Sequence, residues 1–139
     1  MERPRLHVSS VVLGAADPRE LAAFYHRLLG WAVAEEYPAR PGHPAEDGWA
    51  ILRPPPGESG LRGLAVQWEP DYRPPAWPPA PGEPQMMMHL DIAVDDLEAG
   101  VAWALQAGGT LADYQPQEHV RVLLDPAGHP FCLFRSPAA

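Results

Sequence analysis

The sequence predicts an α+β fold in which a βαβββ unit occurs twice within one domain of 139 residues. Each half of the chain holds one capped helix, with a strand before it and three strands after it. The residues that open and close the two helices also repeat at one spacing: Asp17 and Asp96, like Gly30 and Gly109, lie 79 positions apart. Self-similarity of this kind indicates an internal duplication.

The first helix is predicted over residues 18–29. Asp17 is a favourable N-cap, Pro18 stands where its missing N–H costs nothing, and Glu20 completes a capping box. Apolar residues then recur at spacings of three and four residues, and Gly30 ends the helix. The strands of this unit are predicted at 6–13, 31–36, 49–53 and 61–68.

A proline-rich stretch, residues 70–84, follows the first unit. Its seven prolines exclude a helix or an interior strand, so it is predicted as a connector. The chain is therefore expected to be a single domain over 1–139, with units at about 5–69 and 86–135 joined by this connector.

The second unit repeats the order of the first. Asp95 and Glu98 form a second capping pair, and the helix is predicted over 97–107. Gly63 and Gly128 precede the last strand of their units and lie 65 positions apart. The strands of the second unit are predicted at 86–94, 110–114, 119–124 and 130–135.

Charge and cysteine content narrow the classes of function. The chain has 18 acidic and 10 basic residues, a net charge of −8, and no cluster of basic residues, so nucleic acid is not expected as a partner. The N-terminus has the pattern of neither a signal peptide nor a membrane span, and Cys132 is the only cysteine. We therefore expect a soluble, cytoplasmic protein that has no membrane partner.

Three segments carry a family resemblance when they are taken together and in order. They are LGAADP with FY and LLGW at residues 13–31, HLDIAVDDL at 89–97, and DPAGHPF at 125–131. With them the chain resembles the vicinal oxygen chelate superfamily, which holds glyoxalase I, extradiol dioxygenases, fosfomycin-resistance transferases and bleomycin-resistance proteins. It is most similar to the glyoxalase-like domain branch. The resemblance implies a curved mixed sheet with helices on the convex side and a metal or substrate on the concave side.

The resemblance also implies four symmetric ligand positions, one in the first and one in the last strand of each unit. Counting from the helix caps and from the glycines before the last strands assigns these positions to Ser10, Gln67, His89 and Cys132. Metal-dependent relatives need mostly His and Glu there, because a metal is held by deprotonated ligands. Only His89 is a strong ligand of that type, Gln67 is compatible with some glyoxalases, and Cys132 replaces a Glu. No cofactor is therefore predicted, and a divalent metal is the less favoured alternative.

Strand alternation predicts which other side chains face the hollow. In the strand at 86–94, Met87, His89 and Asp91 share the face opposite to Met86 and Leu90. His89 and Asp91 could act as an acid/base pair, or Asp91 could be structural and His89 a hydrogen-bonded cavity residue. No catalytic residue is assigned. The predicted ligand-binding residues are Ser10, Gln67, Met87, His89, Asp91 and Cys132.

These observations favour a small-molecule-binding protein of the glyoxalase/bleomycin-resistance type, without the metal-dependent reaction of its catalytic relatives. Two alternatives stay open. One is a lyase or isomerase resembling lactoylglutathione lyase, or a dioxygenase, acting on a small carbonyl or aromatic substrate. The other is a regulatory or interaction domain. A homodimer is expected, because curved half-sheets leave edges that need covering.

Overall fold

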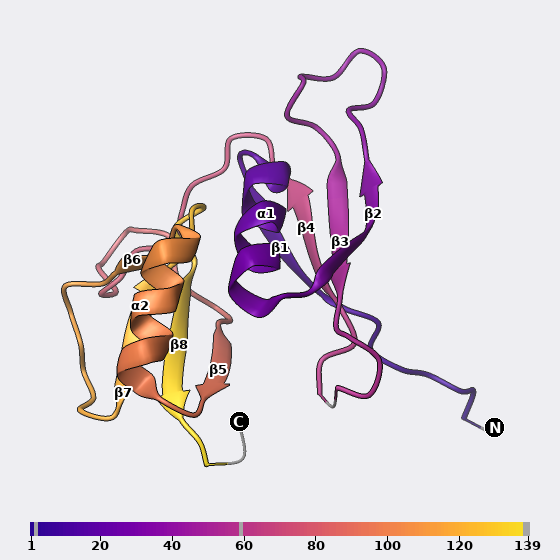
Figure 1. The fold of residues 1–139 in the computed structure, drawn as a ribbon. Coiled ribbons are helices and arrows are strands. Elements are labelled where there is room, and N and C mark those ends of the chain that lie inside the picture. The colour runs from indigo at the N-terminus through magenta and orange to yellow at the C-terminus, as the bar shows by residue number, and fades with distance from the viewer. Residues whose placement is uncertain (2, 59, 138–139) are drawn as a thin grey trace. The chain divides into compact units, whose positions relative to one another are not determined.

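The computed structural model describes residues 1, 3–58 and 60–137, and in these residues it contains two four-stranded mixed sheets and two helices (Figure 1). The predicted α+β fold of two βαβββ units is confirmed. The contacts within the chain divide it into two compact units, Met1–Pro70 and Asp71–Ala139. In the described part of the chain, neither helix is long and apolar enough to cross a membrane.

The first unit consists of one sheet covered on one face by one helix. Its sheet has the order β1-β4-β3-β2, with β1 parallel to β4 and the other neighbours antiparallel. Helix α1 buries Leu21, Phe24 and Tyr25 against the sheet, whose Leu52 and Leu64 are fully buried. The elements are β1 (Val11–Ala15), α1 (Pro18–Leu29), β2 (Ala32–Tyr37), β3 (Trp49–Arg53) and β4 (Leu64–Trp68).

Local capping fixes both ends of α1 where the sequence predicts them. The Asp17 side chain accepts hydrogen bonds from the backbone N–H groups of Arg19 and Glu20, at 3.0 and 3.2 Å. Gly30 adopts a left-handed conformation with φ of 70°, and its N–H donates to the carbonyl of His26. Because each contact spans only a few residues, the ends follow from the sequence alone.

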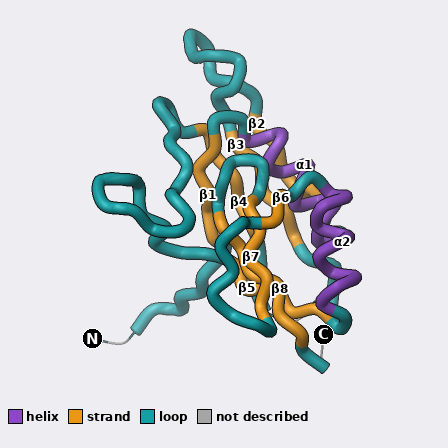
Figure 2. The backbone as a smooth tube through the Cα atoms, turned by 90° about the vertical axis from the view of Figure 1, so that its left-hand side faces the viewer, coloured by secondary structure: helices purple, strands orange, loops and turns teal. Residues whose placement is uncertain are grey.

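The second unit repeats this plan with a sheet of order β5-β8-β7-β6, and α2 runs along one face of it (Figure 2). The N-cap of α2 is Asp96, as its spacing of 79 residues from Asp17 predicts, and its side chain accepts from the N–H of Ala99 at 3.0 Å. Asp95, which was paired with Glu98 in the predicted capping box, instead accepts from the N–H of Asp96. The elements are β5 (Leu90–Val94), α2 (Leu97–Ala107), β6 (Thr110–Leu111), β7 (Val120–Leu124) and β8 (Pro130–Arg135).

Two predicted strands, 6–13 and 86–94, start later than expected. In the first unit the ladder begins where Val11 pairs with Leu64, and the residues before Val11 leave Leu6 and Val8 exposed. In the second unit it begins where Leu90 pairs with Phe131, next to the start of β8. A strand ends where its partner ends, and the alternation of side chains ends with it. The strand predicted at 61–68 likewise begins at Leu64, and the one at 110–114 ends at Leu111.

The proline-rich segment, here residues 71–84, packs on the second unit. The Tyr72 hydroxyl donates to the carbonyl of Ala127 at 2.7 Å, and the Trp77 indole N–H donates to the carbonyl of Tyr114 at 3.1 Å. Pro74 lies so close to Gly128 that a Cβ on that glycine would meet the Pro74 Cβ at 2.7 Å. The segment is therefore an ordered part of the second unit.

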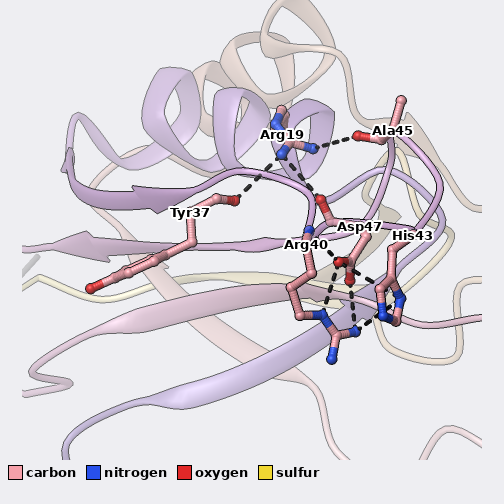
Figure 3. A network of polar contacts seen from close by, with 6 residues as sticks. All are labelled: Arg19, Tyr37, Arg40, His43, Ala45 and Asp47. Carbon is pink, nitrogen blue, oxygen red and sulfur yellow. Dashed lines mark hydrogen bonds and ion pairs between the residues drawn. The ribbon is translucent and has the colours of Figure 1, made fainter.

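A buried carboxylate organises the loop between β2 and β3 (Figure 3). Asp47 is 3% exposed and accepts hydrogen bonds from the backbone N–H, Nε and Nη2 of Arg40, at 2.8–3.0 Å. These bonds hold the pKa of Asp47 far below its ordinary value. Arg19 of α1 donates to the backbone carbonyls of the same loop, including that of Asp47 at 3.1 Å. The loop is thus tied to the helix as well as closed on itself.

Candidate ligand-binding site

The second unit has a pocket of about 160 Å³ on the sheet face that points away from α2. Val94 faces α2, because a Cβ on Gly100 of that helix would lie 3.0 Å from the Cγ1 of Val94. By alternation, Asp91 of β5 faces the other way, and so does Cys132, its register partner in β8. The pocket is lined by Trp77, Met86, His89, Pro116, Gln117, Val120, Val122, Pro130 and Cys132.

Three polar side chains gather at this pocket. His89 Nε2 lies 3.2 Å from Asp91 Oδ1, and the candidate ligand atoms of His89, Asp91 and Cys132 all lie within 4.8 Å of one another. Burial raises the pKa of the Cys132 thiol, and the charge of Asp91 and a hydrogen bond to it raise it further. The thiol is therefore protonated at neutral pH, and it is a poor nucleophile in this state.

The structure brings part of the predicted site together. His89 and Cys132 line the pocket, and Asp91 lies beside them. Met87 does not line it: the residue is 86% exposed, and Met86 takes the place in the wall that was expected of Met87. The reason is the late start of β5, because residues 86–88 precede the ladder and do not follow its alternation.

Ser10 and Gln67 belong to the first unit, where they line a separate hollow of about 360 Å³. The amide of Gln67 donates to Glu69 Oε1 at 2.6 Å. Gln67 is the register partner of Gly14 in β1, four residues beyond Ser10, which separates the two positions by about 13 Å along the strand. Counting from the preceding glycines made Gln67 equivalent to Cys132. The register instead pairs Ala65 with Val12, and Val12 lies 79 positions before Asp91, the register partner of Cys132. By register, therefore, Ala65 and not Gln67 is the equivalent of Cys132.

The donor atoms of the second unit, and not those of the first, fit a divalent cation. Around a tetrahedral Zn²⁺, ligand atoms lie about 3.3–3.8 Å apart, given bonds of about 2.0–2.3 Å. The candidate ligand atoms of His89, Asp91 and Cys132 lie within 4.8 Å of one another, so these three side chains are close enough to share one ion. Ser10 and Gln67 offer only neutral oxygen or nitrogen atoms, which are weak ligands for such an ion.

Several wall residues were missed by the sequence analysis. Trp77 comes from the proline-rich segment, and Pro116 and Gln117 come from the loop before β7. These segments have no periodic pattern, so no local signal marks the direction of their side chains. Val122 was accessible to prediction, because it is the cross-strand partner of Cys132.

Comparison with known proteins agrees with the architecture. A family model described as a glyoxalase-like domain matches residues 10–134. No curated protein sequence matches the chain significantly. A glyoxalase family protein from Enterococcus faecalis has a similar structure, with a TM-score of 0.63, 22% identity, and alignment over 92% of this chain and 96% of that one.

Two further solved structures share the fold. A mutant of the genomically encoded fosfomycin resistance protein FosX from Listeria monocytogenes, in complex with Mn(II) and 1S,2S-dihydroxypropylphosphonic acid, has a TM-score of 0.64 and 11% identity. That alignment covers 92% of this chain and 90% of FosX. TnmS3, an antibiotic binding protein from Streptomyces sp. CB03234, has a TM-score of 0.56 and 18% identity, over 96% and 98% of the two chains. Because the family model matches residues 10–134, most of the sequence, the chain belongs to the glyoxalase-like domain family.

Proposed function

We propose that this protein binds a small, largely apolar organic molecule in the pocket of its second unit. The observation that carries the proposal is the composition of the pocket wall. Trp77, Met86 and Val122 supply apolar surface, while His89 and Gln117 supply polar groups. Apolar walls with a few polar groups that fix orientation are typical of small-molecule sites.

The size of the pocket limits the group that it can hold. Cavities for drug-sized ligands run from about 300 to 1,000 Å³, whereas a cavity of about 150 Å³ accommodates benzene. At about 160 Å³, the pocket matches a single aromatic ring or an aliphatic group of similar volume. The similarity of the fold to TnmS3, an antibiotic binding protein, supports a binding role.

We further propose that the metal-dependent reaction of catalytic relatives is absent. Cys132 stands where the family pattern has a glutamate that accepts a proton, and burial raises the pKa of its thiol. A protonated thiol cannot act as a general base. We also propose that the protein is cytoplasmic, that it forms a homodimer, and that its ligand is a small molecule.

A titration of aromatic and cationic compounds tests the binding proposal. Binding is followed by calorimetry and by tryptophan fluorescence, because Trp77 lines the pocket. His89→Ala is expected to cost about 1–3 kcal/mol of binding free energy, because a buried polar group of the ligand loses its partner. His119→Ala, which removes an exposed histidine outside the pocket, is the matched control.

Two further variants in the same titration sharpen the test. Trp77→Ala removes apolar wall and is expected to weaken binding as well. Gln67 stays a proposed contact, and Gln67→Ala is expected to weaken binding if the hollow of the first unit takes part. Binding that is unchanged in both His89→Ala and Trp77→Ala would place the ligand elsewhere.

The contact between His89 and Asp91 favours a second candidate function. An imidazole 3.2 Å from a carboxylate can take up and return a proton beside a carbonyl, which is the chemistry of a lyase or isomerase. In deuterated water, such activity exchanges the hydrogen next to the carbonyl of a small substrate, and proton NMR detects its loss. Exchange that persists at the wild-type rate in His89→Ala excludes this role for the pair.

A further inference from the structure

The pocket of the second unit is enclosed by regular structure on one side and by irregular segments on the other. Its floor is the sheet, which supplies Val122 and Cys132 from the paired strands β7 and β8, and α2 packs on the opposite face of that sheet. Trp77 comes from the proline-rich segment, Met86 from the residues between that segment and β5, and Gln117 from the loop before β7. Because a ligand cannot cross a hydrogen-bonded sheet, it must enter past these irregular segments.

The Trp77 side chain joins two of the irregular segments. Its indole N–H donates to the carbonyl of Tyr114 at 3.1 Å, and the centroids of the two rings are 5.8 Å apart. Both contacts lie near the surface, since Trp77 is partly exposed and Tyr114 is 48% exposed. Water can replace an exposed hydrogen bond, so the bond between Trp77 and Tyr114 can open at little cost to the fold.

The backbone that carries Trp77 is fixed more firmly than its side chain. The N–H of Ala76 donates to the carbonyl of Pro84 at 2.9 Å, which closes the segment into a loop directly before Trp77. At the start of the segment, the Tyr72 hydroxyl donates to the carbonyl of Ala127 at 2.7 Å. Rotation of the Trp77 side chain can therefore open the contact with Tyr114 while the segment itself stays in place.

We propose that the Trp77 side chain is the gate of this pocket, and that its hydrogen bond to Tyr114 is the latch. With the bond made, the indole is part of the wall and the pocket has a volume of about 160 Å³. When the side chain rotates, this part of the wall is withdrawn and a wider molecule can enter. Side-chain rotation at a surface is fast, so the rate of entry follows the fraction of time for which the gate is open. The inference rests on the proposed function, because it names what controls access to that site.

The only cysteine of the chain reports on the gate, because Cys132 lines the pocket and is partly exposed. Its thiolate adds to the double bond of a maleimide: a carbon–sulfur bond forms, the neighbouring carbon takes up a proton, and no group leaves. The full-length protein is treated separately with N-methylmaleimide and with the larger N-phenylmaleimide, and mass spectrometry gives the two rates. The ratio of the larger reagent's rate to the smaller one's measures access, because a changed pKa of the thiol alters both rates by the same factor.

Two substitutions of Trp77 test the latch and the gate in turn. Trp77→Phe keeps a ring but loses the N–H, and it is expected to raise the ratio by about two- to tenfold, the factor that corresponds to one exposed hydrogen bond. Trp77→Ala removes the gate, and it is expected to raise the ratio further. Trp103→Ala, which removes an exposed tryptophan of α2 outside the pocket, is expected to leave the ratio unchanged. Circular dichroism of each variant checks that it is folded.

A further control, Tyr72→Phe, separates a moving side chain from a moving segment. It removes the hydroxyl that bonds Ala127 and leaves Trp77 intact, so the ratio is expected to stay unchanged. An equal rise in Tyr72→Phe and Trp77→Phe overturns the assignment of the gate to one side chain. An unchanged ratio in both Trp77 variants overturns the gate itself, and a rise in Trp77→Ala alone overturns the latch. Because no ligand takes part, compounds that fail to bind in the titration count against the proposed function alone.

Discussion

At the scale of single residues, the Asp47 carboxylate stays charged although it is buried, because Arg40 pairs with it. Asp47 is almost fully buried, yet the guanidinium and the backbone N–H of Arg40 hold it in its charged form. In the folded protein its pKa is therefore lowered below its unfolded value of about 3.9. The stabilisation that follows is complete above about pH 4 and disappears as the pH falls toward the folded-state pKa.

Replacing this carboxylate is expected to remove that pH dependence. Asp47→Asn lowers the free energy of unfolding at about pH 7, because a neutral amide forms weaker hydrogen bonds with the Arg40 guanidinium than a carboxylate does. The difference in unfolding free energy between variant and wild type narrows at about pH 3. Urea unfolding at both pH values measures this difference. Glu46→Gln, an exposed neighbour, is the control. A difference of the same size at both pH values contradicts the role assigned to Asp47.

The candidate site was predicted in part, and the reason lies in particular residues. His89 and Asp91 lie on or next to the ladder of β5, where alternation holds, so their common face followed from the sequence. Cys132 was placed by the family resemblance, and the register confirms it as the partner of Asp91. Met87 lies before the ladder, and its exposed side chain could not be foreseen from alternation. The place of Gln67 depended on strand register, which counting from a glycine does not determine.

At the scale of elements, helix ends were the most predictable feature, because caps are local. The Asp17 carboxylate accepts two backbone N–H groups of α1. Asp17→Ala is expected to lower the free energy of unfolding by about 0.5–2 kcal/mol, whereas Asp17→Ser keeps most of it. Urea denaturation monitored by circular dichroism measures both. Equal stability of Asp17→Ala and the wild type would show that this cap adds nothing.

Strand ends were less predictable, since each depends on a partner that is distant in the chain. Leu6 and Val8 have the composition of a strand, but β4 offers a partner only from Leu64 onward, opposite Val11. Likewise, the seven prolines of residues 70–84 marked an absence of regular structure. They gave no sign that the segment would pack on the second unit.

The packing of the proline-rich segment yields a test of its own. Gly128 has φ of 85°, and a Cβ there would meet Pro74, whereas Gly57 has φ of 89° and open space around it. Gly57→Ala is expected to cost about 1–2 kcal/mol of unfolding free energy for its backbone conformation alone. Gly128→Ala is expected to cost more, by about 1 kcal/mol or above, because Pro74 must move. Thermal unfolding of the two variants compares them, and equal losses contradict the contact.

At the scale of the whole molecule, the open edges of the two sheets predict self-association. In the described residues, β1 and β2 border the first sheet, and β5 and β6 border the second. Unpaired edges are usually covered, and a second copy is the simplest cover. Light scattering at micromolar concentration is expected to give twice the mass of one chain. A mass equal to that of one chain contradicts the homodimer.

Because residues 71–84 pack on the second unit, they determine where the chain can be cut when the two units are exchanged or circularly permuted. An exchange of halves that cut the chain before Met86 would strip the second unit of Trp77 and of the Tyr72 hydroxyl that bonds Ala127. A cut between Pro70 and Asp71 keeps those contacts within one piece. The second unit therefore has an N-terminal extension, residues 71–84, that the first unit lacks. A circularly permuted chain that begins at Asp71 preserves it, and one that begins at Met86 does not.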